Sequence, residues 1–146
     1  MVNLFHVYLQ TGLITSAEQL LPSLPPNYAP QAKAILSLAQ ENFTEAISQY
    51  TTLLETSQSI LLANNLSLTY LYSANVQSAI QVLEPMLKLQ GGKDRGVLPH
   101  AVYNLCTMYE IRDDSARRRK EEIMESVVGG YGDVCGKGRF KLDSLR

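Results

Sequence analysis

The stretch that decides the fold is LLANNLSLTYLYSANVQSAIQVLEPMLKLQ, which occupies residues 61–90. Its apolar side chains recur at intervals of three and four residues, which is the spacing of one face of an α-helix. The pattern breaks at residues 73–75, Ser-Ala-Asn, which are small or polar and suit a tight turn between two helices. The stretch therefore predicts one helical hairpin, with a first helix to about Tyr72 and a second from about Val76.

The second half of this hairpin has a close relative upstream. Residues 75–80, NVQSAI, match residues 42–47, NFTEAI, and the alanines Ala79 and Ala46 are 33 residues apart. A helix–turn–helix unit of about 34 residues is typical of the tetratricopeptide (TPR) repeat, which this chain resembles. Ala17 marks a third copy, 29 residues before Ala46. Because a methyl side chain lets two helices cross closely, all three alanines are expected to be buried.

These repeats predict an all-α, TPR-like helical-hairpin solenoid of about four hairpins, followed by a Gly-rich C-terminal tail. At 146 residues the chain has the length of one domain. We expect one helical repeat domain over residues 1–128 and a tail over residues 129–146, in which Phe140 and Leu142 dock onto the last hairpin. The hairpins are expected at about residues 2–24, 31–57, 61–90 and 99–128.

Charged side chains are scarce and unevenly spread. They make up 18% of the chain, where about 25% is usual, and residues 1–92 hold only two basic and five acidic ones. We expect other protein to cover part of so uncharged a surface. A net charge of −1 does not favour binding to nucleic acid. The sequence has no apolar run of about 18 residues, so we expect no insertion into a membrane. The chain begins inside its first repeat without a polar capping helix, so we expect more protein to precede it.

The sequence offers no residue set for catalysis, a metal or a cofactor. His6 and His100 have no nearby nucleophile with an orienting carboxylate, and two cysteines far from two histidines are too few for a metal site. The sequence allows a disulfide between Cys106 and Cys135, but two cysteines without a larger set of disulfide-forming cysteines are more typical of reduced thiols. We therefore predict a protein that is not an enzyme, with no cofactor and no small-molecule substrate.

The fourth unit departs from the repeat pattern. It begins with YNLCTMYE at residues 103–110 and continues, after a polar break, into a helix that carries Arg and Lys at residues 117–120, followed by acidic side chains. VVGGYGD and a closing FKL come next. These segments resemble the C-terminal end of subunit 12 of the TRAPP complex, the transport protein particle, over about residues 97–142. NLCTMYE is the most specific part, because most TPR first helices have Gly or Ala where Cys106 stands.

The resemblance implies a non-catalytic protein-interaction subunit of a vesicle-tethering complex in endoplasmic reticulum to Golgi traffic and autophagy. It implies other subunits of that complex as partners, and a cytoplasmic location with peripheral association with endoplasmic reticulum–Golgi membranes. The alternative is a TPR peptide-binding co-chaperone or another scaffold adaptor. Such domains hold a peptide carboxylate with Lys, Arg and Asn, and this chain offers Asn65 and Asn104 without the basic side chains.

Two groups of side chains are candidates for binding a partner. The first lies on the predicted first helices and comprises Asn64, Asn65, Leu68, Leu71, Asn104 and Thr107. Of these, Asn64, Leu68, Leu71 and Thr107 are expected to line the concave side and to be more exposed than Leu66 and Tyr70. The second is basic and comprises Arg117, Arg118 and Lys120. Positive charge in the first turn of a helix opposes the helix dipole by about 0.3–1 kcal/mol per exposed charge. An acidic partner surface and simple solvation beside the following glutamates both remain open for the second group.

Overall fold

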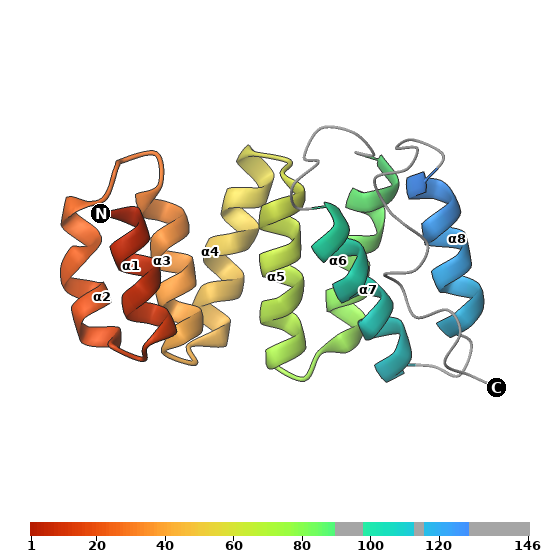
Figure 1. Cartoon of the computed structure of the whole chain (residues 1–146), viewed down its shortest axis with the longest axis horizontal. Helices are drawn as coiled ribbons and strands as arrows, with labels where there is room; N and C mark the ends of the chain where they lie inside the picture. Colours follow the sequence, from red (N-terminus) through yellow and green to blue (C-terminus); the bar gives the residue numbers. More distant parts are fainter. Residues whose placement is uncertain (90–97, 113–115, 129–146) are drawn as a thin grey trace. The chain divides into compact units, whose positions relative to one another are not determined.

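The computed structural model describes residues 1–89, 98–112 and 116–128. Within these ranges the chain is α-helical and has no strand (Figure 1). The elements are α1 (Val2–Gln10), α2 (Ile14–Leu20), the short 3₁₀ helix η1 (Leu21–Ser23), α3 (Ala29–Ala39), α4 (Phe43–Thr56), α5 (Ile60–Tyr72), α6 (Val76–Leu89), α7 (Leu98–Arg112) and α8 (Ala116–Val128). The predicted fold class, all-α with TPR-like helical hairpins, is confirmed.

The helices form two compact units. In the first, Met1–Ser57, α1 packs on α2, α2 on α3 and α3 on α4. In the second, which starts at Gln58, α5 packs on α6, α6 on α7 and α7 on α8, while α5 also packs on α7 and α6 on α8. Contacts of a helix with both its next and its next-but-one neighbour, as in this second unit, are what stacked hairpins produce. The assignment of residues 1–128 to one domain stays a prediction.

The turns inside the first three hairpins share one backbone geometry. Each has one residue with a positive φ, of 75°, 62° and 60° at Gly12, Glu41 and Ala74. In each turn the next residue donates its N–H to the carbonyl five residues earlier, at 2.8–2.9 Å: Leu13 to Tyr8, Asn42 to Ser37 and Asn75 to Tyr70. This is the Schellman arrangement, in which a left-handed residue ends a helix and satisfies its last carbonyls. The repeat is therefore visible in the backbone as well as in the sequence.

The three predicted alanines follow these turns at a constant interval. Ala17, Ala46 and Ala79 each lie five residues after the positive-φ residue, and all three are fully buried. Their burial was expected and is confirmed. A methyl group at each of these positions suits a close crossing of the two helices of a hairpin.

The proline-rich segment between α2 and α3 is packed into the first unit. Leu24 joins a buried cluster with Phe5, Ala17, Ala32 and Leu36. Residue 31 was expected to begin the next helix, but α3 begins two residues earlier and holds a proline in its first turn. A proline is tolerated there because the first N–H groups of a helix have no partner within the helix.

The hydroxyl of Tyr28 lies at the start of α3 and holds α1 to this segment. It is hydrogen-bonded to Nε2 of His6 at 2.8 Å, with the donor set by the histidine tautomer. The ring of Phe5 meets the ring of Tyr28 edge-on, with centroids 6.5 Å apart. Burial raises the pKa of Tyr28. His6 is half-buried and is used in packing, so its surroundings do not indicate a catalytic role.

Candidate partner-binding surfaces

Helices α5 and α7 lie side by side and are joined by two polar contacts. Nδ2 of Asn104 donates a hydrogen bond to Oδ1 of Asn64 at 2.8 Å. One turn further along both helices, the hydroxyl of Ser67 donates to Sδ of Met108 at 3.2 Å. The two contacts advance together along both helices, so α5 and α7 run parallel in a defined register. Parallel first helices are the arrangement expected of consecutive stacked hairpins.

Asn64, which was expected on the concave side and more exposed than Leu66 and Tyr70, is buried and is less exposed than Tyr70. Its side chain is only 7% exposed, because it lies on the face of α5 that packs against α7. A buried amide needs hydrogen bonds, and Asn104 supplies one. Asn65, its neighbour, is rotated by about 100° around the helix and is half-buried. The two asparagines therefore point in different directions from α5, and Asn65 is the more exposed of the two.

The other candidates of this group are partly accessible. Leu68, Leu71 and Thr107 are half-buried, whereas Leu66 is buried, as expected. Tyr70 is also half-buried, so the expected contrast in exposure holds for Leu66 and not for Tyr70. The exposed aromatic and aliphatic side chains on the same two helices include Tyr72, Tyr103 and Ile111. The binding of a partner by any of these side chains stays a prediction.

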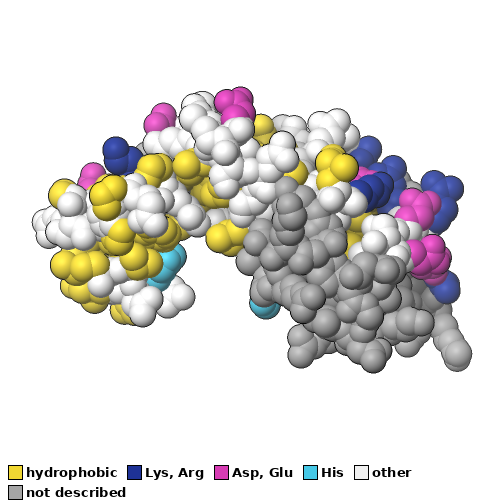
Figure 2. All heavy atoms as spheres, turned by 90° about the horizontal axis from the view of Figure 1, so that it is seen from above, with side chains coloured by type: hydrophobic (Ala, Val, Ile, Leu, Met, Phe, Trp, Pro, Cys, Tyr) yellow, Lys and Arg dark blue, Asp and Glu magenta, His cyan; other side chains and the backbone are white. Residues whose placement is uncertain are grey.

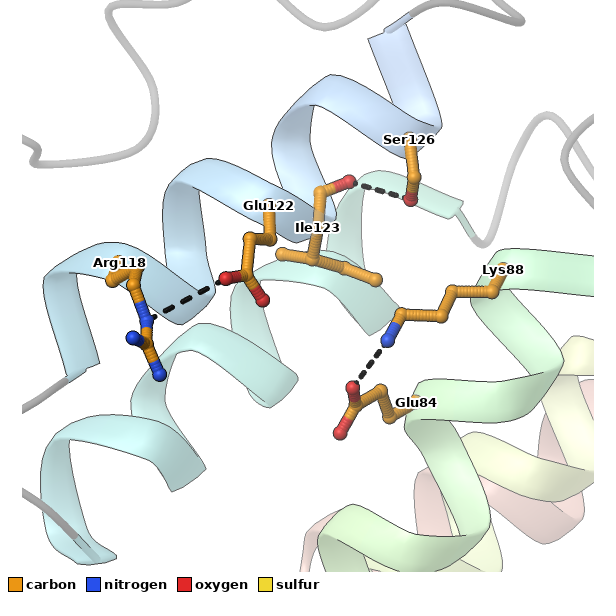
Figure 3. A network of polar contacts seen from close by, with 6 residues as sticks. All are labelled: Glu84, Lys88, Arg118, Glu122, Ile123 and Ser126. Carbon is orange, nitrogen blue, oxygen red and sulfur yellow. Dashed lines mark hydrogen bonds and ion pairs between the residues drawn. The ribbon is translucent and has the colours of Figure 1, made fainter.

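The basic group on α8 divides into exposed and buried members. Nε of Arg117 lies 3.2 Å from Oε1 of Glu121, one turn along the helix. Nε of Arg118 lies 3.5 Å from Oε1 of Glu122, also one turn along, and Figure 3 shows this second pair. Both pairs are largely exposed and contribute little to stability. Figure 2 shows the same alternation of basic and acidic side chains on the surface of α8.

Lys120, the third basic candidate, is buried, and its binding of a partner stays a prediction. Its side chain is 11% exposed, and its Nζ is paired with Oε1 of Glu110 on α7. A buried ammonium group is costly without a partner, so the lysine joins α8 to α7. The guanidinium group of Arg119 lies over the ring of Tyr109, 5.8 Å from its centroid, and adds a second contact between the same helices.

The thiol of Cys106 and the hydroxyl of Tyr109, both on α7, are in their neutral forms at neutral pH. Burial raises the pKa of the Cys106 thiol to about 11, with Lys120 lowering it and Glu110 raising it by smaller amounts. Burial also raises the pKa of Tyr109, and the charge of Glu84 and a hydrogen bond to that carboxylate raise it further. A thiol with so high a pKa stays protonated at neutral pH and is a poor nucleophile. Cys106 was expected to be buried, and it is.

Metal-ligand clusters and membrane-spanning helices are two further features that bear on function. In residues 1–89, 98–112 and 116–128, no three or more His, Cys, Asp or Glu side chains come together in a way that could hold a metal ion. None of the helices in these ranges is long and apolar enough to cross a membrane. Cys135 and the tail residues Phe140 and Leu142 lie outside the described residues.

A second repeated motif lies on α1, α5 and α7, the first helices of three of the hairpins, and the 33-residue spacing does not reveal it. The pattern Asn-Leu-x-x-x-Tyr occurs at residues 3–8 (NLFHVY), 65–70 (NLSLTY) and 104–109 (NLCTMY). Its copies are 62 and 39 residues apart, so a fixed repeat length misses them. A search for the motif alone would have found it and aligned α1, α5 and α7 residue by residue.

Comparison with known proteins gives two related matches. The chain is 32% identical over 111 residues to "Trafficking protein particle complex subunit 12" of Homo sapiens, and 31% identical over 112 residues to the protein of the same name from Mus musculus. Each match covers 75% of this chain. The resemblance to TRAPP subunit 12 is confirmed.

The extent of the similarity to TRAPP subunit 12 differs from the expectation. A match of 111 residues cannot fit within residues 97–142, so it reaches well upstream, into hairpins that were expected to share only a general TPR character. The chain spans about one seventh of the length of the human and mouse subunits, 15% and 14%. No protein-family profile and no solved structure matches the chain.

Proposed function

We propose that this chain is a non-catalytic, protein-interaction part of the trafficking protein particle complex, in the place that subunit 12 takes in the human and mouse complexes. The observation that carries the proposal is the similarity to subunit 12 over three quarters of the chain. The chain acts in vesicle traffic between endoplasmic reticulum and Golgi and in autophagy. It works in the cytoplasm, at the surface of those membranes, and binds other subunits of the complex.

The fold supports this proposal. Stacked helical hairpins offer long surfaces on which other proteins bind. Three side chains of the second unit with reactive potential are used in packing: Tyr109 contacts Glu84, Lys120 is paired with Glu110, and Cys106 is buried and holds its proton. Chemistry at these groups would require breaking the contacts that hold α6, α7 and α8 together.

A partner-binding face is proposed on α7. Tyr103, Thr107 and Ile111 are four residues apart and share one side of the helix. Tyr103 is 59% exposed and Ile111 is 57% exposed. Exposed aromatic side chains are common among the residues that dominate protein–protein binding energy. The half-buried Leu68 on the neighbouring α5 would extend this face.

The co-chaperone alternative loses its main support. Asn104 was one of two asparagines available to hold a peptide carboxylate, and one of its two amide N–H groups donates to Asn64. Helix α5 carries no Lys or Arg, so no cation accompanies the asparagines on that helix. A carboxylate bound there would be left without a charged partner, which is costly.

Affinity purification followed by quantitative mass spectrometry tests the proposal. The tagged chain, expressed in cells that make it, is expected to enrich the subunits of the trafficking protein particle complex. A variant with Tyr103→Ala and Ile111→Ala is expected to lose most of that enrichment. The control Leu89→Ala, which alters an 81% exposed side chain on α6, is expected to keep it. If the parent chain enriches none of these subunits, the proposal is wrong.

A further inference from the structure

Lys120 stands at an interior position of α8. Two second helices share a buried pattern with a spacing of four residues: Ala79, Leu83 and Leu87 in α6, and Ala116, Lys120 and Met124 in α8. Helix α4 likewise has the buried Tyr50 four residues after the buried Ala46. The fourth hairpin therefore has a lysine where the second and third have an uncharged, bulky side chain.

The two ends of the Lys120–Glu110 pair differ in their access to water. The side chain of Lys120 is 11% exposed, whereas that of Glu110, on α7, is 50% exposed. Without Glu110, the lysine would be a buried ammonium group with no counter-charge, which is strongly destabilising. Without Lys120, Glu110 would be an ordinary carboxylate in contact with water, which costs little. The pair is therefore asymmetric: only the lysine depends on its partner.

The neighbouring charged groups are used in other contacts. On α8, Glu121 and Glu122 lie beside Arg117 and Arg118 on the outer surface of the helix (Figure 3). On α6, Glu84 lies 2.6 Å from Nζ of Lys88 and contacts the hydroxyl of Tyr109. Arg119 lies over the ring of Tyr109. Among the described residues, Glu110 is thus the carboxylate that is paired with Lys120.

Helix α7 has its own attachments to the preceding hairpin. It packs on α5 and α6, and the hydrogen bonds from Asn104 to Asn64 and from Ser67 to Met108 join it to α5. None of these contacts involves α8. A leucine at position 120 would hold α8 by apolar packing alone, whereas the lysine makes the packing of α8 depend on a charge that water reaches.

We infer that the Lys120–Glu110 pair is a latch: it holds α8 on α7, and removal of the charge of Glu110 releases α8 while α5, α6 and α7 stay packed. Glu110 is the end at which the latch opens, because it is the half-exposed member of the pair. The inference goes beyond the proposed function and does not rest on it, since it concerns an equilibrium within this chain alone.

The thiol of Cys106 reports the release. Cys106 lies one turn before Glu110 on α7 and is buried, and the charges of Lys120 and Glu110 both act on the pKa of its thiol. In the full chain with Cys135→Ser, Cys106 is the remaining cysteine, and its reaction with an aromatic disulfide reagent is followed without denaturant. Adding Glu110→Gln is expected to speed this reaction by about tenfold or more, because the lysine then lacks a counter-charge.

Three further variants separate a latch from general loss of stability. Lys120→Leu alone is expected to react no faster than the parent, and Lys120→Leu added to Glu110→Gln is expected to restore the parent rate. Glu121→Gln is the matched control, because it removes a 49% exposed carboxylate whose partner is also exposed, and it should react like the parent. Hydrogen exchange in Glu110→Gln is expected to speed in residues 116–128 and to stay at the parent rate in α5.

Three results would overturn the inference. The first is a parent rate of thiol reaction in Glu110→Gln. The second is a faster reaction in Lys120→Leu that equals that of Glu110→Gln, since the contact itself would then matter and not the unpaired charge. The third is an equal speeding of exchange in α5 and in residues 116–128, because the second unit would then unfold as a whole. The experiment contains no other subunit of the trafficking protein particle complex, so these outcomes leave the test of the proposed function separate.

Discussion

Replacing Ala74 by glycine is expected to stabilise the chain. Ala74 ends α5 with a φ of 60°, a left-handed conformation in which the Cβ of an L-residue crowds the following carbonyl oxygen. The turn needs this conformation, because it lets the N–H of Asn75 reach the carbonyl of Tyr70 at 2.8 Å. Glycine adopts the same backbone without the steric cost.

The size of the effect is a difference of two terms. A non-glycine residue in the left-handed region costs about 1–2 kcal/mol. Glycine in the unfolded chain gains conformational freedom that lowers stability by about 0.4–1 kcal/mol. Ala74→Gly is therefore expected to raise the free energy of unfolding by about 0.5–1 kcal/mol. The reverse change, Gly12→Ala, is expected to lower it by a similar amount, because a Cβ at Gly12 would meet no atom within 4 Å and only backbone strain would be added.

Urea unfolding followed by circular dichroism measures these changes. The control is Gln81→Gly, on the exposed side of α6, where glycine is expected to cost about 0.8–1 kcal/mol because it replaces a good helix former. The prediction thus requires opposite signs for two glycine substitutions in neighbouring elements. If Ala74→Gly and Gln81→Gly destabilise the chain equally, the reasoning from the positive φ is refuted.

Three further changes test other parts of the structure. Ala79→Leu is expected to lower the free energy of unfolding by about 1–3 kcal/mol, since extra methylenes must enter a filled crossing; a urea midpoint equal to that of the parent would contradict this. Because burial raises the pKa of Cys106 from 9.0 to about 11, its thiol ionises first in the unfolded chain, and stability should fall as pH rises from about 9 to 11. Unfolding measured across that range should show a shallower fall for Cys106→Ala. If Phe140 and Leu142 dock on the last hairpin, changing both to serine should speed hydrogen exchange in residues 116–128; unchanged exchange would leave the tail free for a partner.

Local pattern was enough to predict the hairpins. The three-and-four periodicity of residues 61–90, the break at residues 73–75 and the spacing of Ala46 and Ala79 all reflect residues that meet within one hairpin or recur from one hairpin to the next. The helices and the buried alanines therefore followed from the sequence. The Asn-Leu-x-x-x-Tyr motif is equally a property of the sequence, and it aligns α1, α5 and α7 without any knowledge of how these helices pack.

The candidate site depended on information that the sequence pattern does not contain. Asn64 and Lys120 are polar, and residue type alone places polar side chains at the surface. Both are buried, because α7 lies against the faces that carry them and supplies Asn104 and Glu110 as partners. Those partners are 40 and 10 residues away in the chain, and helical periodicity says nothing about which helix covers which face. Burying a polar group is favourable only where its partner is positioned, and that position is set by the packing of hairpins against one another.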